Sequence, residues 1–298
     1  MANSDTRALV QSMRVVIHSM RLYFWPILAL NATTMTIAVR GDARRGALFS
    51  IVISLLASFG FLVNDLWDRN VDRINRPGRF EDSDKTTLGL GMAAAIVCLI
   101  LGVGTAFWLG PRELDIAFVL ALGLAAYSIV LRRYLIVPTV LAGFLAASPI
   151  WAPLLLWPRN VRPMHWTFVA AMALLLAARE TLMDLRDRDG DRIGARDTIA
   201  TAFGARAAKS TASILLLSGA ALLCSVLLVQ TVHLTVPSAL TAAVAVCLIL
   251  ALTLTPAYGA IRPDTEDRDQ HGAIQSFLGW SRAAMLLLPL LNLFLWRG

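Results

Sequence analysis

Two groups of three aspartates share one spacing in this chain and are its clearest candidates for chemistry. They are Asp65, Asp68 and Asp72 in the stretch NDLWDRNVD, and Asp184, Asp187 and Asp191 in the stretch DLRDRDGD. In both groups the residues stand at i, i+3 and i+7. If each stretch continues as a helix, about 100° per residue places its carboxylates within about 60° of one another. Each group therefore predicts an acidic stripe, which Asn64 and Glu180 extend at the amino-terminal side.

Two acidic stripes that face each other repel unless a positive charge lies between them. Oxygen ligands without His or Cys suit Mg²⁺, which commonly shares one or two carboxylates with the phosphates of a substrate. The sequence therefore predicts that the two stripes hold Mg²⁺ around a diphosphate. The alternative is that both stretches are solvated helix ends with local ion pairs. The repeated spacing behind two apolar runs favours the metal-binding interpretation.

Long apolar runs must position these stripes. The chain has 298 residues, of which 57% are hydrophobic and 16% charged, and runs of about 18 to 25 apolar residues match the ~30 Å of a hydrocarbon core. Such continuous spans must be helices, because lipid offers no partner to an open sheet edge. Nine spans are predicted, at 22–39, 46–63, 86–110, 114–131, 134–157, 164–178, 210–231, 237–260 and 277–296.

The expected fold is an all-α membrane protein: one domain over 1–298, with about nine transmembrane helices around a central cavity and cytoplasmic helical loops capping it. A polar leader precedes the first span. With nine spans, most Lys and Arg fall in that leader and in the loops after the second, fourth, sixth and eighth spans, so these segments are predicted to be cytoplasmic. The net charge of +7 then reflects topology and anionic lipid, and a nucleic-acid partner is not required.

At the aspartates the sequence resembles the UbiA superfamily of intramembrane prenyltransferases. NDLWDRNVDRINRP is similar to its first aspartate-rich motif and DLRDRDGDRIGARDT to its second, and the resemblance covers most of the chain. It implies that Mg²⁺ on the two motifs binds an isoprenyl diphosphate, and that the carbocation left by diphosphate departure attacks a lipophilic acceptor. By position, it implies metal-binding and catalytic roles for Asn64, Asp65, Asp68, Asp72, Asp184, Asp187 and Asp191.

Four further residues are predicted to bind substrate. The stretch YSIVLRR resembles a Tyr-and-Lys/Arg element of the family and contributes Tyr127 and Arg132, although its basic residue falls five rather than four positions after the tyrosine. Arg76 lies in INRPGR, which is similar to the family's continuation of the first motif. Glu180 extends the second stripe. Its neighbour Arg179 lies in or beside a span, where a charge is functional or paired, so an Arg179–Glu180 ion pair is an alternative.

Aromatic side chains near the predicted cytoplasmic helix ends are candidates to stabilise a carbocation, because their faces attract positive charge. They are Tyr23, Phe24, Trp25, Phe61, Trp67 and Tyr127. The alternative is that they sit at the membrane interface, where Trp and Tyr are enriched.

The acceptor is the least determined part of the sequence-based prediction. A quinone-precursor aromatic ring is favoured by its frequency in the family, with the enzyme in a bacterial inner membrane and its site facing the cytoplasm. A membrane terpene cyclase, which needs no acceptor, is the first alternative. The spacing DxxDxxxD of the second motif also resembles enzymes that prenylate a glycerophosphate lipid. A cation transporter is a fourth possibility, but its site is expected nearer the bilayer midplane.

Overall fold

The computed structural model describes residues 2–75, 85–131, 134–231, 235–262 and 267–295, and these ranges contain helices and no strands. The long helices are α1 (Ala2–Ser19), α2 (Trp25–Arg40), α3 (Ala43–Trp67), α5 (Lys85–Leu109), α6 (Pro111–Ile129), α9 (Pro163–Arg186), α12 (Gly204–Thr231), α13 (Val236–Ile261) and α14 (Asp267–Met285). Shorter elements are η1 (Leu22–Phe24), α4 (Arg69–Asn75), α7 (Val137–Ala146), α8 (Ser148–Leu156), η3 (Pro158–Asn160), α10 (Arg188–Ile193), α11 (Ile199–Ala202) and α15 (Leu288–Leu295).

The predicted all-α membrane fold is confirmed. Each of the nine apolar ranges lies largely on one helix or on two consecutive helices. Five helical segments in the described residues are long and apolar enough to cross a membrane, or six if the bent pair α7–α8 is one span. That pair corresponds to the predicted span 134–157 and turns by 66° between its two helices. Pro149 and Pro153 lie just after the turn and lack the backbone N–H that a straight helix needs.

The amino-terminal segment differs from the polar leader that the sequence indicated, because it forms helix α1. The residues Leu9, Val10, Met13 and Ile17 recur at helical intervals and are exposed, so one side of α1 is apolar. A buried hydrogen bond of 2.7 Å between the hydroxyls of Ser12 and Thr87 attaches α1 to α5. Polar residues between the apolar ones lower the local average hydropathy, which hid this helix.

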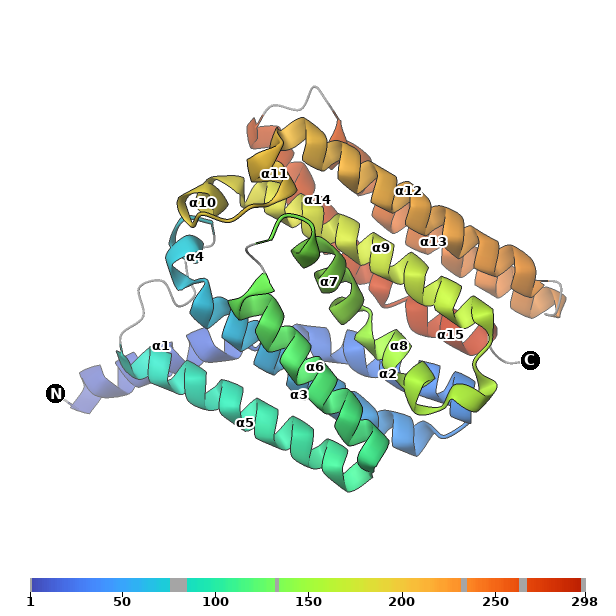
Figure 1. Ribbon diagram of the computed structural model, residues 1–298, viewed down its shortest axis with the longest axis horizontal. Helices are drawn as coiled ribbons and strands as arrows, with labels where there is room; N and C mark the ends of the chain where they lie inside the picture. The colour runs from blue at the N-terminus through green and yellow to red at the C-terminus, as the bar shows by residue number, and fades with distance from the viewer. Residues whose placement is uncertain (1, 76–84, 132–133, 232–234, 263–266, 296–298) are drawn as a thin grey trace.

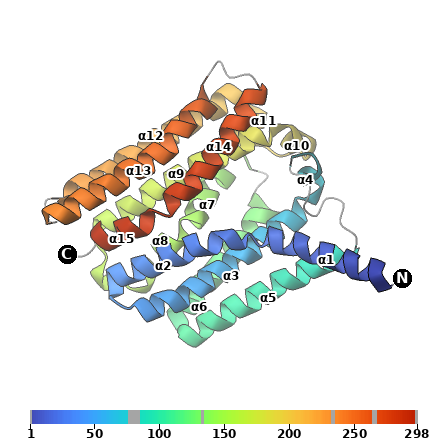
Figure 2. The same ribbon diagram turned by 180° about the vertical axis from the view of Figure 1, so that it is seen from behind.

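The helices form two groups around a central space. Helix α3 packs between α2, α5 and α6, while α9 packs against α7 and α12, and Figures 1 and 2 show these groups on opposite sides of the molecule. Helix α15 contacts α2 and closes the ring, with an Asn292 to Thr34 hydrogen bond of 3.2 Å across that contact. At one end, the short helices α4 and α10, which follow α3 and α9, lie side by side (Figure 1).

The contact between α7 and α9 depends on a glycine. A Cβ added at Gly143 would collide with the Ala173 carbonyl oxygen and lie 3.0 Å from the Ala177 Cβ. Small residues at such contacts let helix backbones approach closely in membrane proteins. Gly104, on the exposed side of α5, has no neighbour within 4 Å of the same added atom.

We expect Gly143→Ala to lower the free energy of unfolding by about 1–3 kcal/mol, because the overpacked helices must separate. Gly104→Ala is the control and should be neutral or stabilising by up to about 1 kcal/mol, since Ala favours a helix. Thermal unfolding of both variants in detergent measures this. Equal melting temperatures for the two would contradict the packing role of Gly143.

Candidate active site

Both aspartate groups lie at a break between a long helix and a short one. Helix α3 ends at Trp67, and Asp68 is its C-cap with φ −87° before α4 begins. Helix α9 ends in the same way, with Asp187 as C-cap at φ −91° before α10. The expectation that each group forms a stripe on one continuous helix is therefore wrong. In each group the middle aspartate marks the turn, and the third lies on the short helix.

The two short helices bring the aspartate groups together. The Gly190 N–H donates to the Asn75 Oδ1 at 3.0 Å, which ties α10 to α4. A Cβ at Gly190 would collide with the Asn75 side chain, and one at Gly194 would lie 2.5 Å from the Val71 Cγ2. Gly190 and Gly194 of the second motif therefore allow α10 to lie close to α4, and this contact brings the two aspartate groups together.

Five of the six aspartates are buried, each with an exposed fraction of 5% or less. Asp184 is partly buried. Arginines contact the buried carboxylates. Arg196 reaches both motifs, with one nitrogen on Asp68 and another 3.4 Å from Asp191. Arg186 binds Asp187 through two hydrogen bonds of 2.6 and 2.9 Å. Buried carboxylates are tolerated when they are paired in this way.

A third pair joins Arg21 to Asp65 at 2.8 Å, with Asp65 fully buried. Neither Arg21 nor Arg196 was among the residues selected from the sequence. Arg21 stands directly before the first apolar run, and Arg196 follows Asp191, the last of the three aspartates in the second motif, by five residues. Arginines at such positions usually reflect topology. Their role emerges only when the fold places them against aspartates distant in sequence.

With these pairs in place, the described residues contain no group of three His, Cys, Asp or Glu side chains arranged to hold a metal ion. The donor types nevertheless fit Mg²⁺, because the two motifs offer only oxygen ligands. Arg76 and Arg132, which were predicted to bind substrate, lie outside the described residues.

A cavity of about 300 Å³ opens beside the paired carboxylates. Its lining includes three residues predicted from the sequence, Asn64, Tyr127 and Glu180. The described lining residues do not include the six aspartates, but they include Arg21 and Arg186, which bind Asp65 and Asp187. The remaining wall is mostly apolar, which is typical of small-molecule sites.

Polar and aromatic groups within the cavity are arranged in specific contacts. The Tyr127 hydroxyl donates to the Glu180 Oε1 at 2.6 Å, and no Arg179–Glu180 ion pair forms between these described residues. Among the aromatic candidates, Tyr23, Phe24 and Phe61 line the cavity as Tyr127 does. Trp25 instead donates to the Ser58 hydroxyl, and Trp67 is exposed.

Comparison with known proteins identifies the family. The model of the UbiA prenyltransferase family matches residues 23–296, so this chain belongs to that family, as the two motifs predicted. Solved structures share the fold: a UbiA homologue from Aeropyrum pernix K1 has a TM-score of 0.72 with 16% identity, covering 90% of this chain and 96% of the other. A UbiA homologue from Archaeoglobus fulgidus bound to GPP and Mg²⁺ has a TM-score of 0.69, with 16% identity over 94% of this chain and 99% of the other.

Similar curated proteins include digeranylgeranylglyceryl phosphate synthases of archaea. That of Saccharolobus solfataricus is 31% identical over 176 residues, which is 58% of this chain and 62% of the relative. That of Methanoregula boonei is 30% identical over 167 residues, covering 53% of this chain and 57% of the relative. The matches thus span about three fifths of the length of these relatives.

We expect Arg196→Gln to lower the free energy of unfolding by about 3–5 kcal/mol, because it leaves buried carboxylates of both motifs without their shared cation. Adding Asp68→Asn should restore part of this loss, since it removes one of the buried charges that Arg196 no longer balances. A double-mutant cycle of denaturant unfolding in detergent measures the coupling. Strictly additive effects would contradict the bridging role of Arg196.

Proposed function

We propose that this protein is a Mg²⁺-dependent prenyltransferase that moves a prenyl group from an isoprenyl diphosphate to a lipid alcohol carrying a phosphate. The observation that carries the proposal is the meeting of both aspartate motifs, through α4 and α10, beside an apolar cavity. Membership of the UbiA prenyltransferase family supports the reaction type.

In this proposal Mg²⁺ is held by Asn64, Asp68 and Asp72 of the first motif, with Asp65 beside them, and by the second-motif residues Asp184, Asp187 and Asp191. When bound, the metal stabilises the charge on the departing diphosphate. The arginines on these carboxylates are equally suited to bind phosphate oxygens, since a guanidinium binds both groups bidentately. We therefore expect Arg186 and Arg196 to exchange carboxylate contacts for diphosphate contacts when the donor and metal bind. The structure of a UbiA homologue from Archaeoglobus fulgidus bound to GPP and Mg²⁺ supports Mg²⁺ and an isoprenyl diphosphate as the ligands.

The cavity supplies the remaining chemistry. Its apolar wall keeps water from the allylic carbocation, which water would otherwise capture. The aromatic candidates Tyr23, Phe24 and Phe61 also line the cavity, with Arg282 beside the first two rings and Arg21 beside the third. Glu180 is the acidic side chain among the described lining residues. As the prenyl carbon–oxygen bond to diphosphate breaks, a new bond forms to the acceptor hydroxyl oxygen, whose proton passes to Glu180.

The acceptor proposed here differs from the aromatic quinone precursor that the sequence favoured. The similar curated proteins are synthases of digeranylgeranylglyceryl phosphate, and the DxxDxxxD spacing of the second motif agrees with that choice. These relatives are archaeal, so a bacterial inner membrane has no support from the comparison. The excess of Lys and Arg in the motif-bearing loops supports a site that faces the cytoplasm.

The decisive experiment uses purified protein in detergent with radiolabelled geranyl, farnesyl or geranylgeranyl diphosphate, with Mg²⁺ or EDTA. The acceptors are a prenylglyceryl phosphate and a hydroxylated aromatic acid. A metal-dependent product that requires the phosphate lipid is expected. A product that requires the aromatic acid would overturn the acceptor, and a hydrocarbon formed without acceptor would indicate a cyclase. If the donor is not consumed under any condition, the protein is not an enzyme acting on these diphosphates, and the cation transporter becomes the remaining alternative.

We expect Asp68→Asn and Asp187→Asn each to lower kcat by about 100-fold or more, because a neutral amide binds Mg²⁺ far less well and metal stabilisation is worth several kcal/mol. Asp189→Asn is the matched control, since Asp189 lies between the motif residues on α10 with its side chain 80% exposed. Steady-state rates and folded yield of the three variants test this. Near-normal turnover in either motif variant would contradict the assignment.

A further inference from the structure

The cavity wall carries more positive charge than its own acidic groups balance. Its described lining residues include four arginines, Arg21, Arg179, Arg186 and Arg282, and one acidic residue, Glu180. Arg21 and Arg186 bind the aspartates of the two motifs. Arg179 and Arg282 have no carboxylate within salt-bridge distance in the described part of the chain. The Nε atom of each is buried and lacks a hydrogen-bond partner among those residues.

The surroundings of Arg179 are unfavourable for an unbalanced charge. Its Nη1 contacts the Met183 sulfur at 3.5 Å, which is a weak acceptor. Arg21, Arg186 and Arg282 line the same cavity, and Glu180 is the acidic residue among its described lining residues. Arg179 is half-buried, and its buried Nε has no hydrogen-bond partner among the described residues. A guanidinium in this position is suited to bind an anion that enters the cavity.

Arg282 approaches the same region from α14. Its guanidinium lies 5.5 Å from the ring centroid of Tyr23 and 5.8 Å from that of Phe24. These aromatic faces stabilise the cation without occupying its hydrogen-bond donors. Helices α9 and α14 contact each other, and Arg179 and Arg282 line the same cavity. Two guanidinium groups in one cavity form the type of site that binds a phosphate through several charge-assisted hydrogen bonds.

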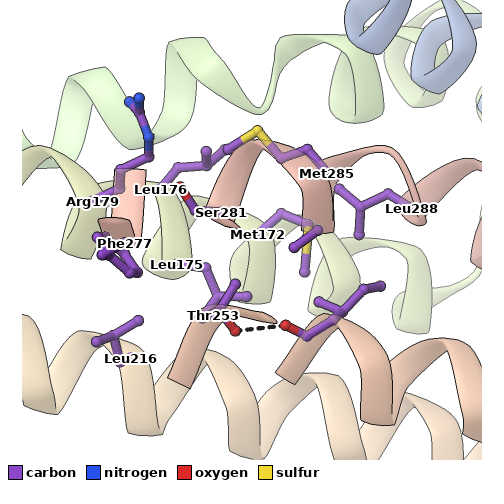
Figure 3. A pocket seen from close by; sticks show the side chains of 12 residues that line it. Met172, Leu175, Leu176, Arg179, Leu216, Thr253, Phe277, Ser281, Met285 and Leu288 are labelled. Atoms are coloured by element: carbon purple, nitrogen blue, oxygen red, sulfur yellow. Dashed lines mark hydrogen bonds between the residues drawn. The ribbon is translucent and has the colours of Figure 1, made fainter. Parts of the chain in front are cut away.

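A small side chamber shows that no counter-charge comes from behind Arg179. This chamber, about 40 Å³, shares Leu176, Arg179, Met285 and Leu288 with the main cavity. Its polar groups are satisfied internally, because Thr253 donates to the Ile249 carbonyl and Ser281 to that of Leu278. Figure 3 shows the Arg179 guanidinium turned away from Leu216 and Thr253 on the chamber's far side. The described lining of this chamber therefore offers Arg179 no counter-charge.

The position of Arg179 separates it from the diphosphate end of the site. Leu176, Arg179, Met183 and Arg186 all line the cavity from α9, at intervals of three or four residues. Arg186 marks the motif end, where it binds Asp187. Arg179 lies seven residues earlier, which is about 10 Å deeper along the helix, with Met183 between the two charges. The cavity thus offers two cationic levels, and the donor diphosphate belongs to the level with the carboxylates.

We infer that Arg179 and Arg282 form the binding site for the phosphate of the acceptor lipid, distinct from the site of the donor diphosphate. This inference rests on the proposed transferase function and names the part of the acceptor that the protein recognises. It also places the acceptor next to Glu180, the neighbour of Arg179 and the proposed proton acceptor.

The test compares two acceptors with the same prenyl chain, a prenylglyceryl phosphate and the corresponding prenylglycerol without phosphate. Arg179→Gln and Arg282→Gln should raise the KM for the phosphate lipid about 10- to 100-fold, which is the loss of one or more charge-assisted hydrogen bonds. The KM for the diphosphate donor and the activity with prenylglycerol should stay within about threefold of wild type. Arg159→Gln is the control, because Arg159 is exposed in η3.

A binding measurement without donor or Mg²⁺ makes the result independent of catalysis. The phosphate lipid should raise the melting temperature of the wild-type protein in detergent more than prenylglycerol does, and both arginine variants should lose that difference. Arg179→Lys keeps the positive charge and should retain most of the difference in melting temperature between the two lipids. This variant distinguishes loss of the phosphate site from poor folding.

Two outcomes would overturn the inference: equal losses with both lipids, or a raised KM for the donor alone, which would assign the arginines to the diphosphate. If wild type transfers no prenyl group but still shows the arginine-dependent melting shift, the proposed function fails while the phosphate site stands.

Discussion

Arg196 contacts Asp68 of the first motif and Asp191 of the second, and the arrangement of the site depends on this kind of charge balance. Carboxylates from two distant parts of the chain are buried at one end of a helical bundle. They can stay there only with positive charge between them. In this structure arginines of the same chain supply it, and in the proposed reaction Mg²⁺ replaces part of that charge while the diphosphate takes over the released arginines.

The helices place the charged groups next to one another. Helices α3 and α9 both end at an aspartate motif, at the same end of the bundle (Figure 1). The breaks at Asp68 and Asp187 turn the chain into α4 and α10, and the side chain of Asn75 fits against Gly190 because glycine has no Cβ. The cavity continues inward from the charged end to an apolar wall. A long hydrocarbon chain and a charged head group can therefore be accommodated by one continuous site.

The sequence predicted the parts that depend on local pattern. Apolar runs located the helices, and the spacing of Asp65, Asp68 and Asp72 and of the second group identified the motifs. It did not predict the helix breaks, because a C-cap at Asp68 or Asp187 is fixed by the contact between α4 and α10 rather than by local propensity. Arg21 and Arg196 were missed for a related reason, since arginines at the membrane edge are common and only the fold pairs these two with aspartates.

The sequence did not predict the second group of positive charges, formed by Arg179 and Arg282. Arg179 stood in or beside a predicted span, where an ion pair with Glu180 was one expectation. In the structure Glu180 accepts a hydrogen bond from Tyr127, and both Arg179 and Arg282 line the cavity. In the proposed function, the two motifs bind and activate the donor. The arginine pair explains how one lipid acceptor would be chosen over another.

The most direct test of the account is an experimental structure of the protein with Mg²⁺ and a thio analogue of an isoprenyl diphosphate, which binds but does not ionise readily. The account predicts Mg²⁺ at about 2.0–2.1 Å from carboxylate oxygens of both motifs, with the Arg196 guanidinium moved from Asp68 and Asp191 to the phosphate oxygens. A diphosphate bound away from the motifs, or held while Arg196 still joins the two aspartates and no metal lies between them, would contradict it.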